Sequence, residues 1–123
     1  MKVLILDGYN LIYKAKSGFK GAEHAVTFNF FRSLKPLIAK HKPDLCYFVL
    51  EGYPKHRFKI QPEYKAGRPK QNDNFLNQKR QIIDMLKMFP VLIAKHSDYE
   101  CDDVAYSIAL EHDALDHDVT IIS

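Results

Sequence analysis

Four short apolar runs punctuate the chain, and each has the length and composition of a buried β-strand. They do not alternate with polar residues, which is typical of strands that are covered on both faces. The runs occupy residues 3–6, 45–50, 91–94 and 119–122. The first two end in an acid followed by glycine, which indicates a turn directly after each strand.

The segments between these runs place apolar residues three and four positions apart, as on one face of an α-helix. Three stripes have this spacing, namely Phe28, Phe31, Leu34, Leu37 and Ile38; Phe75, Ile82, Leu86 and Phe89, with Lys79 at the polar edge; and Val104, Ala105, Ile108 and Ala109 after a start near Cys101. Pro36 is expected to kink or break the first helix, because proline removes a helical hydrogen bond.

Strands and helices therefore alternate along the chain, and this order predicts an α/β fold. A parallel sheet would be flanked by helices in three layers, with right-handed crossovers. The length of 123 residues suits one small domain, and 46% hydrophobic residues suffice for a packed core. There is no internal repeat and no interdomain linker, and the long irregular stretch contains Pro54, Pro62 and Pro69.

Acidic residues follow three successive strands. Asp7 ends the first run, Glu51 the second, and Glu100, Asp102 and Asp103 come soon after the third. Ligands of open parallel sheets bind beyond the carboxyl ends of the strands, so these acids are expected to gather at one edge. Their mutual repulsion and their oxygen atoms favour two Mg²⁺ or Mn²⁺ ions. The alternatives are turn chemistry at Asp7, helix-dipole acids at 102 and 103, and a solvated Glu51.

Composition points to an intracellular, cytoplasmic protein. No apolar run approaches the roughly 20 residues of a membrane span, and the N-terminus meets an acid after four apolar residues, too few for a signal peptide. Cys46 and Cys101 fit no metal-ligand spacing, and no disulfide is expected; the six histidines share no ligand spacing either.

Charge is divided unevenly along the chain, although the net charge is only +3. Residues 53–80 contain eight Lys and Arg against two acids, whereas residues 97–118 contain eight acids and no Lys or Arg. The basic part is suited to a polyanion and the acidic part to metal ions, while the alternative is two solvated faces of opposite sign.

Three blocks resemble the 5′ nuclease superfamily, which includes the N-terminal domain of bacterial DNA polymerase I, phage 5′ exonucleases and flap endonucleases. The blocks are residues 4–13 (LILDGYNLIY), residues 49–52 and 57–68 with a Tyr-Lys-x-x-Arg motif, and residues 99–105 (YECDDVA). They occur in the family's order and at similar spacing across essentially the whole chain. The resemblance implies a PIN-like fold and a metal-dependent hydrolase that cuts DNA as a 5′-3′ exonuclease or flap endonuclease in replication and repair.

The resemblance also implies roles for individual residues. Asp7, Glu51, Glu100, Asp102 and Asp103 match carboxylates of the metal cluster, although the family usually has aspartate in place of Glu51. Cys101 stands where alanine is usual and is expected to fill a small space, with a soft metal ligand as the alternative.

Basic and aromatic residues match the substrate-binding part of the family. Lys65 and Arg68 would be catalytic by neutralising charge at the scissile phosphate. Contacts to nucleic acid are implied for Lys14, Arg57, Tyr64, Lys65, Arg68 and Lys70. Residues 53–87 match the arch-like region, of which residues 69–87 are expected to order on substrate. Tyr13 is expected to pack rather than to stack on a base.

The family pattern continues past residue 123, with two further aspartates and a helix-hairpin-helix region. The resemblance therefore implies a single incomplete domain over 1–123, truncated before its metal site is complete, with apolar surface exposed near the last strand. The expected partners are branched or 5′-ended DNA and a second polypeptide that supplies the missing half, and no membrane. The alternatives are an inactive or split fragment that only binds nucleic acid, and a PIN-type ribonuclease.

Overall fold

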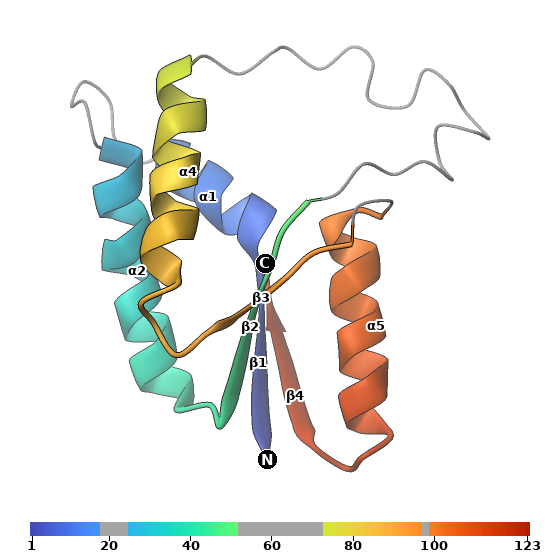
Figure 1. Ribbon diagram of the computed structural model, residues 1–123. Coiled ribbons are helices and arrows are strands. Elements are labelled where there is room, and N and C mark those ends of the chain that lie inside the picture. Colours follow the sequence, from blue (N-terminus) through green and yellow to red (C-terminus); the bar gives the residue numbers. More distant parts are fainter. Residues whose placement is uncertain (18–24, 52–72, 97–98) are drawn as a thin grey trace.

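The computed structural model of the chain describes residues 1–17, 25–51, 73–96 and 99–123. Four parallel strands form one sheet in the order β3-β2-β1-β4 (Figure 1). The strands are β1 (Lys2–Asp7), β2 (Leu45–Val49), β3 (Leu92–Ala94) and β4 (Asp118–Ile122). The predicted parallel sheet is confirmed, and all four strands fall on the four apolar runs.

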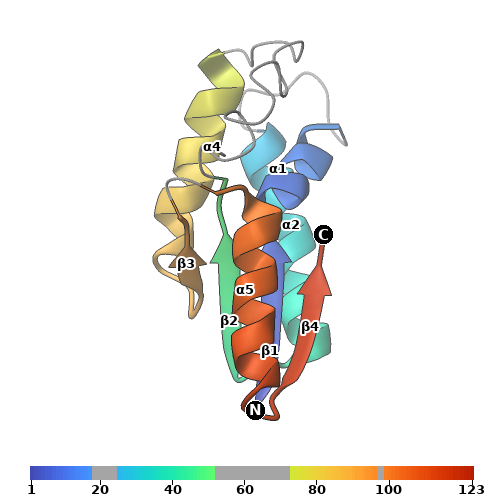
Figure 2. The same cartoon turned by 90° about the vertical axis from the view of Figure 1, so that its right-hand side faces the viewer.

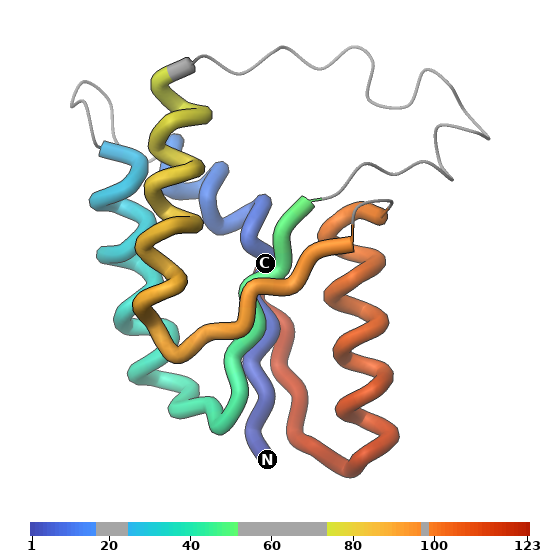
Figure 3. The backbone as a smooth tube through the Cα atoms, in the orientation of Figure 1, coloured from blue at the N-terminus to red at the C-terminus, as the bar shows by residue number. Residues whose placement is uncertain are grey.

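Helices cover both faces of this sheet and complete the three predicted layers. They are α1 (Gly8–Ser17), α2 (Ala25–His41), α4 (Asp73–Leu86) and α5 (Cys101–Asp113). Figures 1 and 2 show α1, α2 and α4 on one face and α5 on the other. The tube in Figure 3 traces how α4 leads to β3 and how α5 leads to β4.

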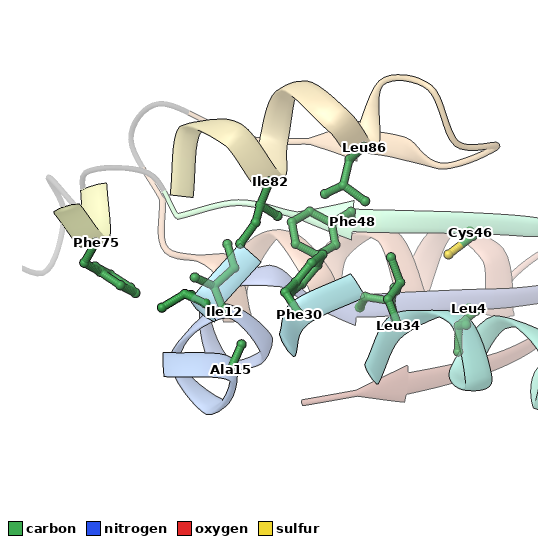
Figure 4. Packing of buried hydrophobic residues seen from close by; sticks show 12 residues of the cluster. Leu4, Ile12, Ala15, Phe30, Leu34, Cys46, Phe48, Phe75, Ile82 and Leu86 are labelled. Carbon is green, nitrogen blue, oxygen red and sulfur yellow. The ribbon is translucent and has the colours of Figure 1, made fainter. Parts of the chain in front are cut away.

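Successive strand residues point to opposite faces of the sheet and pack into two separate hydrophobic cores. Leu4 and Leu6 of β1 pack beneath α1, α2 and α4, together with Phe48 of β2 (Figure 4). Val3 and Ile5 point the other way, toward Cys101 and Ala105 of α5. Because side chains alternate along a strand, Asp7 continues the series of Val3 and Ile5 and belongs to the α5 face.

Helix α1 was not predicted, and two of the predicted helices differ in detail. The apolar residues of α1 include Ile12 and Ala15, which are buried under α2. This helix was missed because its apolar stripe is short and because Asp7-Gly8 at its start resembles a turn. Helix α2 continues through Pro36 without a break. Residues 73–86, expected to order on substrate, already form α4, which is packed against the core through Phe75 and Ile82.

Within the described residues, every helix is too short or too polar to cross a lipid bilayer. Both cysteines are buried and unpaired, as predicted. Apolar side chains are exposed on α5, in the turn after it and on β4, as expected near the last strand, namely Tyr106, Leu110, Leu115 and Ile121.

Candidate metal centre

Asp7 lies at the carboxyl end of β1, where its side chain is 4% exposed. It occupies the position before the first turn of α1, and its Oδ1 accepts a hydrogen bond from the backbone N–H of Asn10 at 3.1 Å. The side-chain amide of Asn10 donates to Oδ2 at 3.2 Å. Asp7 is thus the N-cap of α1, which fixes its carboxylate at the edge of the sheet.

Gly8 allows α1 to begin against the end of β2. A Cβ atom at this position would lie 2.5 Å from the carbonyl oxygen of Val49 and 2.7 Å from a ring carbon of Phe48. Such distances are too short for any side chain, so glycine is required by close approach. The register pairs Asp7 with Val49, so the ends of β1 and β2 meet directly below this turn.

The other acids of this edge surround the first turn of α5. Glu100 precedes the helix in extended backbone conformation, is 5% exposed, and makes no side-chain capping hydrogen bond. Asp102 and Asp103 lie in the first turn, where the helix dipole favours negative charge. Asp102 is exposed and Asp103 is half-buried.

Cys101 joins this helix start to the two strand ends. Its Sγ lies 3.2 Å from Asp7 Oδ1 and 3.2 Å from the carbonyl oxygen of Val49. Burial raises the pKa of the thiol to about 12, with further contributions from the hydrogen bond to Asp7 and from its charge. The thiol therefore keeps its proton at neutral pH in the metal-free protein.

Burial and the neighbouring acids both affect Asp102. The pKa of its carboxyl is raised above its ordinary value, first by burial, then by the charge of Asp7 and a hydrogen bond with it. Glu100 and Asp103 add further negative charge with the same effect.

The carboxylates of these acids are chemically suited to bind a divalent metal ion. Carboxylate oxygens are the ligands that Mg²⁺ and Mn²⁺ prefer, and a cation would relieve the repulsion felt by Asp102. Among the residues that the structure describes, no three His, Cys, Asp or Glu side chains are already arranged as a metal-binding set. The structure thus brings together the predicted acids of β1 and α5 without a finished coordination sphere.

Two other predicted residues lie within the described segments. Glu51 follows β2, is half-buried, and is near enough for its charge to raise the pKa of Cys101. Lys14 is exposed on α1, and its Nζ donates to the backbone oxygen of Ser123 at 2.6 Å. The remaining predicted residues, Arg57, Tyr64, Lys65, Arg68 and Lys70, lie outside the described residues.

Two side chains, those of Asn10 and Cys101, form hydrogen bonds to Asp7. Neither contact was predicted from the sequence. An Asn three residues after an acid at a strand end is the signal that indicates such a cap. A second polar cluster, at the far end of α5, was also not predicted. There the hydroxyl of Tyr47 lies 2.9 Å from His112 Nε2, and His112 Nδ1 lies 2.9 Å from His117 Nδ1.

The chain is similar to known nucleases in sequence. Residues 2–123 match the family model described as 5′-3′ exonuclease, N-terminal resolvase-like domain. DNA polymerase I of Treponema pallidum is 30% identical over 128 residues, which cover 97% of this chain and 13% of the polymerase. Flap endonuclease Xni of Photorhabdus laumondii is 31% identical over 129 residues, which cover 98% of this chain and 48% of the relative.

Solved structures of a phage T5 nuclease share the fold. A T5 protein co-crystallised with metal ions has a TM-score of 0.76 at 20% identity. The T5 flap endonuclease in a pseudo-enzyme–product complex with DNA and metal ions has a TM-score of 0.74 at 19% identity. Each match covers 100% of this chain and 48% of the T5 chain. The chain therefore spans about half the length of these T5 proteins and of Xni.

Proposed function

Because the chain belongs to the 5′-3′ exonuclease family, as its N-terminal resolvase-like domain, we propose that it contributes the acids of β1 and α5 to the metal site of a divalent-metal-dependent 5′ nuclease that hydrolyses DNA. The observation that carries the proposal is the convergence of Asp7 with the acids of α5, where burial first, and then the charge of Asp7, raises the pKa of Asp102. Bound Mg²⁺ or Mn²⁺ would supply charge neutralisation and an activated water at the phosphodiester.

The residues of this chain would divide the work by position. Asp7, held by Asn10, would bind the ion from the β1 side, and Glu100, Asp102 and Asp103 would bind it from the α5 side. Glu51 would act at the same edge, since its charge is felt at Cys101. A complete site of this kind would take two ions.

The proposed substrate is DNA with a branch or a free 5′ end. Support comes from the names of the relatives, which are DNA polymerases and flap endonucleases, and from the T5 complex with DNA. We also propose that residues 53–87 form an arch-like region of the single domain, in which Lys65 and Arg68 neutralise the scissile phosphate. Lys14, Arg57, Tyr64 and Lys70 would contact the strand.

The relatives Xni and T5 nuclease carry about as much sequence again as this chain covers. We therefore assign hydrolysis to this chain together with the counterpart of that remaining half, in the same polypeptide or in a second one. Replication and repair are the processes in which such an enzyme would act.

The test is cleavage of a labelled 5′-flap DNA with Mg²⁺ or Mn²⁺, with the chain alone and with the remaining half of a relative added. We expect Asp102→Asn with Asp103→Asn to abolish cleavage. The matched control is Asp113→Asn, an exposed acid at the far end of α5. Cleavage that persists in the double variant sinks the proposed metal role. Salt-dependent DNA binding without cleavage in either setting identifies a module that only binds nucleic acid.

A further inference from the structure

The buried thiol of Cys101 touches both strand ends that carry the candidate metal centre. Its Sγ is 3.2 Å from Asp7 Oδ1 and 3.2 Å from the Val49 carbonyl oxygen, and its side chain is 2% exposed. A thiol carries one proton, so it donates to one acceptor at a time. The carboxylate is the stronger acceptor of the two, because hydrogen bonds to charged groups are shorter and stronger.

We propose that Cys101 is a positioning residue for Asp7, an inference that rests on the proposed function. The thiol lies between Glu100 and Asp102 in the chain and reaches across to the end of β1. It therefore links Asp7 of β1 to the helix start that carries Glu100, Asp102 and Asp103. Without this link, Asp7 would keep the two hydrogen bonds from Asn10 and the hydrogen bond with Asp102.

The geometry around Asp7 shows what this link adds. Oδ1 receives the backbone N–H of Asn10 from the α1 side and the thiol from the α5 side. Oδ2 accepts a hydrogen bond from the exposed side-chain amide of Asn10 at 3.2 Å, and the carboxyl of Asp102 is also hydrogen-bonded to Asp7. Cys101 thus adds a contact from the α5 side to the same oxygen that the backbone of Asn10 holds. Partners of this kind set the direction of a metal-binding carboxylate.

The competing explanation is that Cys101 only fills space between α5 and the sheet. Cys46 provides the matched control, since it is also a buried thiol but packs in the apolar core on the opposite face. The pKa of Cys46 is raised to about 11 by burial alone, with no contribution from a carboxylate. A space-filling role predicts the same behaviour for both cysteines, and a positioning role separates them.

The first experiment reads the hydrogen bond in metal-free protein, by infrared spectroscopy of the S–H stretch. Cys46→Ala isolates the Cys101 band, and Cys101→Ala isolates the Cys46 band. We expect the Cys101 band at lower frequency than the Cys46 band, because its proton is shared with a carboxylate. Adding Asp7→Asn should move the Cys101 band and leave the Cys46 band in place. Coincident bands in the two single variants overturn the inference, even where Asp7→Asn fails to fold.

The second experiment measures Mn²⁺ affinity by electron paramagnetic resonance of free Mn²⁺. We expect Cys101→Ala to bind Mn²⁺ about fivefold more weakly, as for loss of one weak donor. Cys101→Ser keeps a donor and should bind within about twofold of the original chain. Cys46→Ala should bind as the original does.

The outcomes of the Mn²⁺ experiment distinguish failure of the positioning role of Cys101 from failure of the proposed metal centre. Equal Mn²⁺ affinity in the Cys, Ser and Ala forms at position 101, in folded proteins, removes the positioning role only. An original chain that binds no Mn²⁺ removes the metal centre of the proposed function, and the positioning role falls with it.

Discussion

The two faces of the sheet are buried by unequal means. On one face, three helices enclose an aromatic core in which Phe30 and Phe48 meet edge to face, with ring centroids 5.6 Å apart (Figure 4). On the other face, α5 is the one helix among the described residues that covers Val3, Ile5 and Val49. Because Asp7 belongs to the second face, the candidate chemistry lies on the thinner side and most of the apolar burial on the thicker side.

Small side chains explain why the thin side suits a metal centre. Cys101 and Ala105 are the buried residues of α5 that face β1 and β2. Their size lets the helix start come within hydrogen-bonding distance of the strand ends, where a larger side chain would hold it away. The comparison suggests that stability and metal binding can be changed separately in this molecule.

The largest effect should come from the thick face. Phe48→Ala removes a fully buried ring from the aromatic core and should cost about 3–5 kcal/mol of unfolding free energy. Ile108→Ala on the thin face removes a half-buried side chain and should cost less. Urea denaturation of both variants makes the measurement. Equal losses would show that the two faces contribute alike.

Gly8→Ala should damage both properties at once, since this residue lies where the faces meet. The added Cβ would press on the Val49 carbonyl, and we expect a loss of about 1–3 kcal/mol from overpacking. Displacement of Asp7 should also weaken Mn²⁺ binding. Thermal unfolding and Mn²⁺ titration of one sample test the two effects together, and an unchanged melting temperature contradicts the close approach.

Asn10→Ala should affect metal binding while leaving stability nearly unchanged. The variant loses the amide bond to Asp7 Oδ2 but keeps the backbone N–H that caps α1. We expect Mn²⁺ affinity to change by roughly tenfold or less, the range for an exposed hydrogen bond to a charged group. Asn29→Ala, which loses a side-chain bond to the Ala15 carbonyl, is the control without a carboxylate partner. A large fall in melting temperature without a change in affinity would reverse the expectation.

The smallest effect concerns pH. The raised pKa of Asp102 means that folding favours its protonated form, so its stabilising contribution is complete below 3.8 and is lost as pH rises through the raised value. Asp102→Asn should therefore be more stable than the original at neutral pH without metal. We expect a gain below about 1 kcal/mol, because the residue is exposed.

Melting curves between acidic and neutral pH provide the check. The advantage of Asp102→Asn should shrink toward acidic pH and also on addition of Mg²⁺ to the original chain, since a cation relieves the same repulsion. An advantage that is independent of pH would assign the effect to something other than the carboxyl charge.

Much of the fold could be predicted because strands buried on both faces are continuous apolar runs. The runs at 45–50 and 119–122 lie within one residue of the ends of β2 and β4. Helix α1 could not be predicted in the same way, since it starts at a glycine required by its neighbours across the sheet. That requirement arises from a tertiary contact, which produces no periodic pattern of apolar residues in the sequence.

The candidate site was predictable in its acids and not in their supports. Strand ends bring Asp7 and the acids of α5 to one edge, and this follows from topology alone. The contact between Cys101 and Asp7 depends on which face Asp7 points to, which the parity of Val3 and Ile5 would have indicated. The meeting of His112 and His117 depends on the turn that closes α5, where Asp116 has a positive φ of 59°.

The contact between Cys101 and Asp7 joins residues that lie 94 positions apart. A cation held between β1 and the start of α5 would act as a removable cross-link that closes a loop through most of the chain. Closing so long a loop restricts the unfolded chain strongly, and an ion bound only by the folded form shifts the equilibrium further with its concentration. The supply of divalent ions would then govern how long the folded molecule persists.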